Sequence, residues 1–422
     1  MKKETTTKPT GKLWTRDFTI ITLGSVVSML GNDAAGFAMS LLVLDYTGSS
    51  FYYAVYLAVY LLPSIFVPIL SGPFLDRFSR KRAIYTLDFC SAGLYTLLAL
   101  MLGLGKFNFA LFALATFVMG CIDGVYSVAY ESFYPMLISE GNFTKAYSIS
   151  STLETMTFVM MPVSAFVYNT IGIVWLFAFN ALTFLIAAIF ELQIKTTEQY
   201  VAERKSEMLE KTRNVARQFA SDFKQGIRFL LSEPGLLAVT LYFTFSSLFG
   251  GASNTIDLPY FRSTFSNGEY LFTIVWGMAT VGRMIGGALH YKIKFPTQAK
   301  YAIALGVYVT LSLIEGSYLY FPIPVMMAMT FTTGLLGVTS YNIRISATQS
   351  YVPHEKKGRF NGIFNTLMTA GALVGQLAGG ALATVLPPRA VISGFACITA
   401  LAAVIFIGGN KKAVSKIYNT QA

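Results

Sequence analysis

Long apolar stretches separated by short polar segments run through almost all of the 422 residues. A helix needs about 20 apolar residues to cross the hydrocarbon core of a bilayer, and each stretch is close to that length or longer. The first stretch, 18–44, is too long for the apolar part of a signal peptide. The pattern therefore predicts an all-α integral membrane protein with twelve transmembrane helices, near 18–45, 51–73, 83–104, 108–131, 146–170, 172–192, 236–257, 270–292, 300–320, 323–344, 360–385 and 390–409.

The distribution of basic residues indicates how these helices are oriented. Only 13% of the residues are charged, against about 25% in soluble domains, and cytoplasmic loops of membrane proteins carry an excess of Lys and Arg. Of the 32 Lys and Arg residues, only Lys106, Arg262 and Arg389 fall in loops on the opposite side, and Arg283 falls inside a span. We therefore expect a multi-pass protein of a bacterial-type plasma membrane with both termini in the cytoplasm. The net charge of +11 reflects the basic residues on the cytoplasmic side rather than a nucleic-acid-binding surface.

Composition divides the chain into five segments. They are an N-terminal cytoplasmic tail at 1–17, a helical bundle at 18–192, a polar linker at 193–235, a second bundle at 236–409 and a C-terminal cytoplasmic tail at 410–422. In the linker, apolar residues recur on one helical face with basic residues around them. This pattern predicts an amphipathic helix lying at the cytoplasmic surface of the membrane. A helix that binds a partner protein is the alternative.

The loop between the second and third predicted spans has a specific pattern, Gly72-Pro-Phe-Leu-Asp76-Arg77-Phe-Ser-Arg80-Lys81-Arg82. A glycine lets two helices approach closely, and the basic cluster marks a cytoplasmic loop. The acid at Asp76 is placed to pair with arginines or with the positive N-terminal end of a helix. An ordinary basic loop after a helical hairpin is the alternative. The pattern resembles the loop 2–3 signature, often called motif A, of the major facilitator superfamily of transporters.

Further segments narrow this resemblance. The segments 219–230, 135–142 and 352–359 are similar to the linker and loops of a branch that contains macrolide efflux pumps and the enterobactin exporter. The resemblance implies two pseudo-symmetric six-helix bundles that work by alternating access. In the family, the motif A aspartate braces the outward-open state against the start of span 11, here Gly358-Arg359. Together with two acids near the cytoplasmic ends of spans 3 and 4, these positions form the expected cytoplasmic gate: Gly72, Asp76, Arg77, Arg80, Lys81, Asp88, Glu131, Gly358 and Arg359.

Charged and polar residues inside the spans are candidates for the transport path. A charge at the centre of a bilayer costs about 2.5–3.5 kcal/mol on insertion scales, so such residues face a wet cavity or a partner. The candidates for proton coupling or substrate contact are Asp33, Asp123, Glu154 and Arg283. Pairing among these residues that only locks the bundle is the alternative. Further candidates for lining a substrate cavity are Asn32, Trp276, Asn365, Thr369 and Gln376, and Ser246, Gly250, Ser253 and Asp257 form a polar stripe along span 7.

These observations together favour a secondary active transporter, with proton-coupled efflux of small amphiphilic compounds as the leading hypothesis. Span 5 has Pro162 without the glycines common in drug antiporters, so import, or transport of a metabolite, siderophore or lipid, is the alternative. A sensor without transport activity is a third reading. No nucleophile–base pair, metal-ligand cluster or phosphate-binding loop occurs at a usable spacing, so neither an enzyme nor a cofactor is expected. A monomer that binds a small-molecule substrate is the default expectation.

Overall fold

The structure is a computed structural model that describes residues 11–75, 78–139, 142–196, 215–292 and 295–419. These residues form helices joined by short turns, with no strand among them. The chain divides into two compact units. Unit 1 comprises residues 1–46 and 59–215, and unit 2 comprises 47–58 and 216–422. Composition placed the segment 47–58, which includes the start of the second predicted span, in the first bundle. In the structure this segment groups with unit 2.

The helices of unit 1 follow the predicted spans closely. In chain order they are α1 (Arg16–Thr47), α2 (Ser50–Leu61), α3 (Pro63–Leu75), α4 (Arg80–Gly103), α5 (Phe109–Phe133), α6 (Phe143–Thr170) and α7 (Ile173–Leu192), with a 3₁₀ turn, η1 (Tyr134–Leu137), after α5. The first part of α2 belongs to unit 2. The second predicted span is broken at Pro63, because proline has no N–H to continue the helix. The start of α5 is capped by Asn108, whose side chain accepts a hydrogen bond from the Leu111 amide at 3.2 Å.

The helices of unit 2 are also those that the apolar pattern predicts, with one addition at the C-terminus. They are α9 (Val215–Ser232), α10 (Pro234–Thr264), α11 (Gly268–Lys292), α12 (Lys300–Ser317), α13 (Ile323–Tyr351), α14 (His354–Leu382), α15 (Pro388–Ala402) and α16 (Lys411–Tyr418), with short turns η3 (Thr297–Ala299), η4 (Tyr318–Tyr320) and η5 (Ala403–Gly408) between them. Among the described residues, ten helices are long and apolar enough to cross a membrane. The long helices α6 and α14 occupy the places of the two remaining predicted spans.

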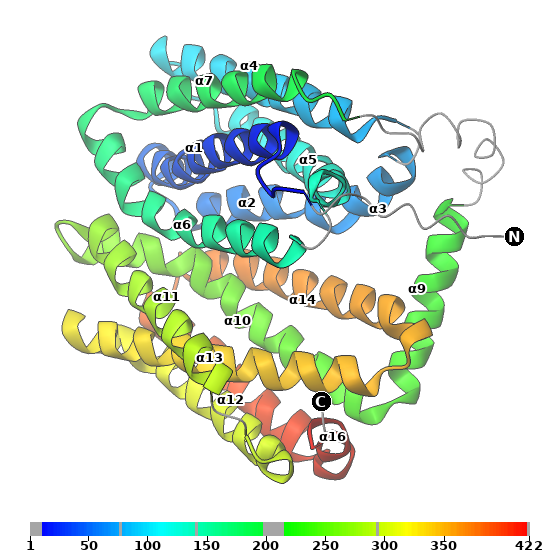
Figure 1. Ribbon diagram of the computed structural model, residues 1–422. Helices are drawn as coiled ribbons and strands as arrows, with labels where there is room; N and C mark the ends of the chain where they lie inside the picture. The colour runs from blue at the N-terminus through cyan, green and yellow to red at the C-terminus, as the bar shows by residue number, and fades with distance from the viewer. Residues whose placement is uncertain (1–10, 76–77, 140–141, 197–214, 293–294, 420–422) are drawn as a thin grey trace, which may run out of the picture. The chain divides into compact units, whose positions relative to one another are not determined.

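Glycines set the spacing within unit 2. The helix α10 lies against α14, and α11 lies against α13 (Figure 1). A Cβ atom on Gly375 of α14 would lie 1.9 Å from the carbonyl oxygen of Leu248, and one on Gly334 of α13 would lie 1.9 Å from that of Ala279. Helices in a membrane associate through such close approach of small residues, since lipid removes the hydrophobic drive between them. The two helix pairs of unit 2 are therefore closely packed.

The C-terminal segment forms part of this packing. The side chains of Val414, Ile417 and Tyr418 in α16 are buried. The hydroxyl groups of Tyr418 and Tyr308 share a hydrogen bond of 2.8 Å, and burial raises the pKa of the Tyr418 phenol, so that the group stays neutral. The Tyr301 amide donates to Asn419 at 3.0 Å. The segment after the last span, expected to be a tail, is thus a short helix anchored to unit 2.

The predicted amphipathic helix is α9. Its Gly226 lies against Ile363 and the Arg359 carbonyl of α14, and the Lys356 ammonium lies 4.6 Å from the centre of the Phe229 ring. Its exposed residues include Ile227, Leu231, Lys224 and Arg228.

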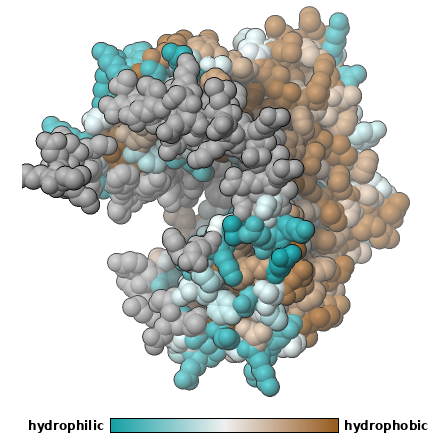
Figure 2. All heavy atoms as spheres, turned by 90° about the vertical axis from the view of Figure 1, so that its right-hand side faces the viewer, coloured by the Kyte–Doolittle hydropathy of each residue, from teal (hydrophilic) through white to brown (hydrophobic). Residues whose placement is uncertain are grey.

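Figure 2 views the molecule from the side where α9 lies, and a broad apolar area is visible along one edge of the view. An apolar surface of this kind is the one that lipid covers in a membrane protein.

Candidate functional site

A cavity of about 670 Å³ lies within unit 1, among helices α1, α4, α5 and α7. Most of its lining comes from α1 and α5. The lining residues are Ser25, Ser28, Met29, Asn32, Asp88, Ser91, Ile122, Asp123, Tyr126, Ser127, Tyr130, Glu131, Tyr134 and Phe184. Three of them are acids, and neither Lys nor Arg occurs among them, within the part of the chain that the structure describes. The cavity wall therefore carries negative charge whenever its acids are ionised, and no described lysine or arginine of the lining offsets that charge.

The polar stripe of α1 forms one wall. The hydroxyl groups of Ser25 and Ser28 donate to carbonyl groups one turn earlier, at 2.7 and 3.1 Å. Such bonds satisfy the hydroxyl groups without a partner helix. The side-chain oxygen of Asn32 accepts a hydrogen bond of 2.9 Å from the hydroxyl of Tyr95 in α4. Asn32, a predicted cavity residue, thus lines the cavity and is held in place by a neighbouring helix.

Asp123 presents its carboxyl group to the cavity from the middle of α5. One of its oxygens accepts a hydrogen bond of 2.8 Å from the hydroxyl of Tyr60 near the end of α2. The carboxyl of Asp33 on α1 lies close enough to interact with it electrostatically. Two of the four predicted path residues are therefore near each other. The side chain of the third, Glu154, lies outside the described residues.

A second pair of carboxyl groups lies at the cavity wall. Asp88 of α4 lines the cavity and is 1% exposed, and Glu191 near the end of α7 is 0% exposed. The two carboxyl groups lie close enough to interact electrostatically. Two carboxylates in a poorly solvated interior repel each other, so a proton on one of them would stabilise the pair. The cavity therefore borders one member of a pair of neighbouring acids.

Glu191 is not among the residues expected from the sequence. It lies at the end of an apolar stretch, where a charged residue is typical of a helix that emerges into water. Its surroundings come from packing instead, because α7 lies along α4 and the Glu191 carboxyl lies beside Gly24 of α1. The signal in the sequence was the acid itself, one residue before the predicted boundary at 192.

Tyrosines form the other notable part of the wall. The rings of Tyr126 and Tyr130 stack with centroids 5.9 Å apart, and those of Tyr130 and Tyr134 stack at 5.2 Å. Residues four apart lie on one face of a helix, so the α5 sequence produces this row of rings directly. The row gives the acidic cavity an aromatic face.

The predicted gate residues are only partly described. Asp76 and Arg77 lie outside the described residues, and only the backbone of Gly72 is described, within α3. Arg80 donates to the Ser132 carbonyl at 3.2 Å, and the Lys81 ammonium donates to the Ile194 carbonyl. Both bonds tie the start of α4 to segments next to α5 and α7. Glu131 is exposed and lines the cavity, and the described residues show no ion pair between it and the arginines.

The predicted residues of unit 2 lie in different surroundings. Gly358, Arg359, Asn365 and Arg283 are exposed, and the Thr369 hydroxyl donates to the Asn365 carbonyl at 2.9 Å. Gln376 is 5% exposed. Trp276 packs edge-to-face on Tyr318 with ring centroids 6.3 Å apart. Within unit 2, Trp276 therefore packs against the neighbouring helix segments and is half-buried.

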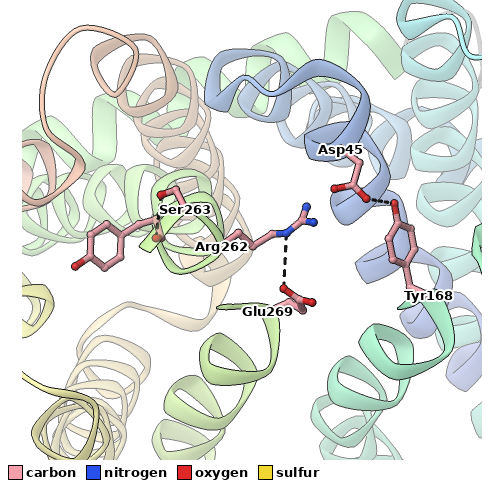
Figure 3. A network of polar contacts seen from close by, with 6 residues as sticks. Asp45, Tyr168, Arg262, Ser263 and Glu269 are labelled. Carbon is pink, nitrogen blue, oxygen red and sulfur yellow. Dashed lines mark hydrogen bonds and ion pairs between the residues drawn. The ribbon is translucent and has the colours of Figure 1, made fainter. Parts of the chain in front are cut away.

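Polar pairs also tie helix ends within each unit. In unit 1 the Tyr168 hydroxyl of α6 donates to Asp45 near the end of α1 (Figure 3). In unit 2 the Arg262 guanidinium lies 3.8 Å from the Glu269 carboxylate across the turn between α10 and α11 (Figure 3). None of these four residues lines the cavity. We therefore interpret both contacts as stabilising the helix ends.

The comparisons with known proteins agree with this architecture. A family model described as Major Facilitator Superfamily matches residues 21–343. The chain belongs to this superfamily. It is accordingly a multi-pass membrane protein and a transporter rather than an enzyme, with the all-helical fold that the sequence predicted.

Individual relatives are distant. An uncharacterized MFS-type transporter of Bacillus subtilis, YkuC, is 24% identical over 290 residues, which cover 66% of this chain and 66% of the relative. Macrolide efflux protein A of Streptococcus pyogenes is 20% identical over 373 residues, which cover 86% of this chain and 88% of the relative. The crystal structure of a bacterial homologue of the iron transporter ferroportin, in an inward-facing state, has a TM-score of 0.67 at 13% identity and covers 96% of this chain and 99% of its own. At this identity the structural likeness shows the fold alone.

Proposed function

We propose that this transporter exports small amphiphilic compounds that carry a positive charge, macrolide-like amines among them, in exchange for protons. It would do so from a plasma membrane, as a monomer with both termini in the cytoplasm. The observation that carries the proposal is the cavity of unit 1, which combines carboxyl groups and tyrosine rings and has no basic residue in its described lining. The distant likeness to a macrolide efflux protein supports the same substrate class.

The charge of the cavity favours cations over anions. A carboxylate inside a membrane protein is costly unless it is paired or wet. An ammonium group entering the cavity would pair with Asp123, whose carboxyl is already oriented by Tyr60. An anionic compound would instead meet acids from α4 and α5 without a compensating cation from the lining. The site therefore selects by the sign of charge.

The tyrosine row provides for the apolar part of the substrate. Rings stacked along α5 offer a flat apolar surface together with hydroxyl groups. Such rings bind apolar surface and also attract cations over their faces. A compound with a bulky apolar body and one amine matches both features. A small hydrophilic ion would use only the carboxyl groups.

Proton exchange follows from the same carboxyl groups. An acid that binds an ammonium group must be ionised. When the substrate leaves, the acid stays behind in a poorly solvated site and takes up a proton, because burial disfavours its charged form. Asp88 at the cavity and its neighbour Glu191 repel each other when both are ionised, which favours a proton shared between them. Binding of a cation at the cavity would therefore favour release of a proton from these acids. Alternating access then moves substrate and protons in opposite directions, with the loop around Asp76 and Arg77 as the proposed cytoplasmic gate.

Everted membrane vesicles test the proposal directly. A pH-sensitive dye would follow the proton gradient while a macrolide, a lipophilic cation, a siderophore and a lysolipid are added one at a time. We expect the cationic amphiphiles to dissipate the gradient and Asp123→Asn to reduce the response about tenfold or more, equivalent to about 1.4 kcal/mol or more. Glu269→Gln is the matched control, since it removes an acid of unit 2 that pairs weakly with Arg262 and is not among the lining residues of the cavity. Equal responses to anions and cations, or an unchanged response in Asp123→Asn, would contradict the proposal.

A further inference from the structure

A second pair of acids, of which one is fully buried, lies inside unit 2. Asp257 of α10 is 1% exposed, although the sequence placed it in a polar stripe suited to substrate contact. Its Oδ2 atom accepts a hydrogen bond from the hydroxyl of Ser253, one turn earlier on the same helix. The Trp276 indole of α11 and the Tyr318 hydroxyl of η4 face the same carboxyl group. Three different elements therefore direct hydrogen-bond donors at one acid.

The donors around Asp257 are incompletely used. Asp257 Oδ1, Trp276 Nε1 and the Tyr318 hydroxyl are all buried, and none of the three has a hydrogen-bond partner of good geometry. Buried polar atoms without a partner are rare and costly. Their position around one carboxyl group means that small shifts of the donors would satisfy an ionised Asp257. In the structure, the carboxyl group is bonded at one oxygen only.

The charged groups that act on Asp257 are few. Glu315 of α12 interacts with it, and Arg283 of α11 acts on Glu315 in turn. Tyr318 of η4 faces both acids, and Tyr242 of α10 interacts with Glu315. From α15, Arg389 donates instead to the hydroxyl of Tyr260. Among the described residues, the charged groups at this site are thus the carboxyl groups of Asp257 and Glu315 and the guanidinium of Arg283.

We propose that Asp257 and Glu315 form a proton-binding site in unit 2, separate from the acids of the unit 1 cavity. Two carboxylates in an interior of low polarity repel each other, so one of them retains a proton while the other is ionised. Arg283 balances the charge on Glu315, and the donors from Ser253, Trp276 and Tyr318 stabilise Asp257 whenever its proton leaves. Uptake and release of one proton at this pair changes the charge beside the Trp276 ring. The use of this proton in the transport cycle rests on the proposed proton exchange, whereas the binding of the proton does not.

Trp276 makes the site measurable without any substrate. The chain has 3 tryptophans, and the other two, Trp14 and Trp175, are exposed. In a Trp14→Phe, Trp175→Phe background, the fluorescence of the purified full-length protein reports only on Trp276. We expect its emission to change in a single step as the pH is varied, because the charge of the neighbouring carboxyl group alters the electric field at the indole. Asp257→Asn should abolish the step, and Asp123→Asn in unit 1 should leave it unchanged.

A second variant covers the case in which Asp257→Asn does not fold. Glu315→Gln removes the neighbouring negative charge, which makes an ionised Asp257 easier to form, so the step should move to lower pH by about one unit. Absence of any step in the parent protein, a step that persists in folded Asp257→Asn, or an unmoved step in Glu315→Gln would each overturn the proposal. Because no substrate is added, these outcomes do not depend on the vesicle experiment. A pH step without any cation-driven proton movement would leave this site standing and remove the proposed export.

Discussion

The two units surround their buried acids in opposite ways. In unit 1, Asp88 and Asp123 border a cavity of about 670 Å³. In unit 2, Asp257 is enclosed by Ser253, Trp276 and Tyr318. A buried carboxyl group needs compensation in either case. Unit 1 places its acids beside open space, whereas unit 2 directs hydrogen-bond donors at Asp257. The difference suggests that unit 1 handles compounds of some size, while unit 2 accommodates only a proton.

Close packing in unit 2 provides the test with the largest expected effect. A Cβ atom on Gly251 of α10 would lie 2.1 Å from the Ala372 carbonyl oxygen, whereas one on the adjacent Gly250 would meet nothing within 4 Å. We expect Gly251→Ala to lower the free energy of unfolding by about 1–3 kcal/mol or to prevent folding, because the backbone of α14 must move. Gly250→Ala should change it by less than about 1 kcal/mol. Thermal unfolding of the two purified variants compares them, and similar melting temperatures would show that unit 2 is less closed than we infer.

The pair of Asp88 and Glu191 in unit 1 gives the next largest effect. Glu191→Gln keeps the size of the side chain and can still donate to Asp88, so we expect the protein to fold. It removes one exchangeable proton beside the cavity, so cation-driven proton movement should fall about tenfold, equivalent to about 1.4 kcal/mol. Proton movement in vesicles, normalised to the amount of folded protein, measures this. Unaltered movement would mean that the pair serves only to hold α4 against α7.

The sequence predicted the transmembrane helices and part of the candidate site. The site residues that it did not predict depend on how the helices pack. Span positions follow from apolar length, which the bilayer dictates, and the polar faces of α1 and α5 follow from helical spacing. That is why Asn32 and Asp123 were identifiable as candidates. Glu191 and Glu315 lie near the ends of apolar stretches, where a charge normally reaches water. The full burial of Glu191 and the partial burial of Glu315 depend on which helices pack beside them, and one sequence does not contain that information.

Contacts between helices also explain why the surroundings of Trp276 and the packing of the C-terminal segment in unit 2 were not predicted from the sequence. Trp276 looked like a cavity residue because an aromatic ring inside a span suits a ligand. In the structure it lies beside Tyr318, which is more than 40 residues later in the chain. The helix α16 lies in the segment 410–422, which was expected to be a tail because it follows the last predicted span. Its burial depends on the pairing of Tyr418 with Tyr308, which no local pattern announces.

The aromatic wall of unit 1 supports a smaller effect, which tests whether the cavity binds bulky compounds. Tyr130→Leu keeps an apolar side chain but removes the ring that stacks between Tyr126 and Tyr134. We expect the affinity for cationic aromatic compounds to fall about three- to fivefold, as for the loss of about 0.5–1 kcal/mol of cation–π energy. Tyr130→Phe should stay close to the parent protein. Ligand titration in detergent measures both, and an equal loss in the two variants would assign the effect to the hydroxyl rather than the ring.

The smallest effect concerns the hydrogen bond that orients Asp123. Tyr60→Phe removes the donor that lies 2.8 Å from its carboxylate, while the ring is retained. One hydrogen bond to a charged group contributes about 1.5 kcal/mol or more when buried, but Tyr60 is 42% exposed, so water replaces much of it. Because the bond favours the ionised acid, its loss should move the pH of half-maximal cation-driven proton movement upward by about half a unit. Tyr341→Phe, an exposed position of unit 2, is the control. A shift to lower pH, or an equal shift in both variants, would mean that Asp123 is not the acid that the substrate and the proton share.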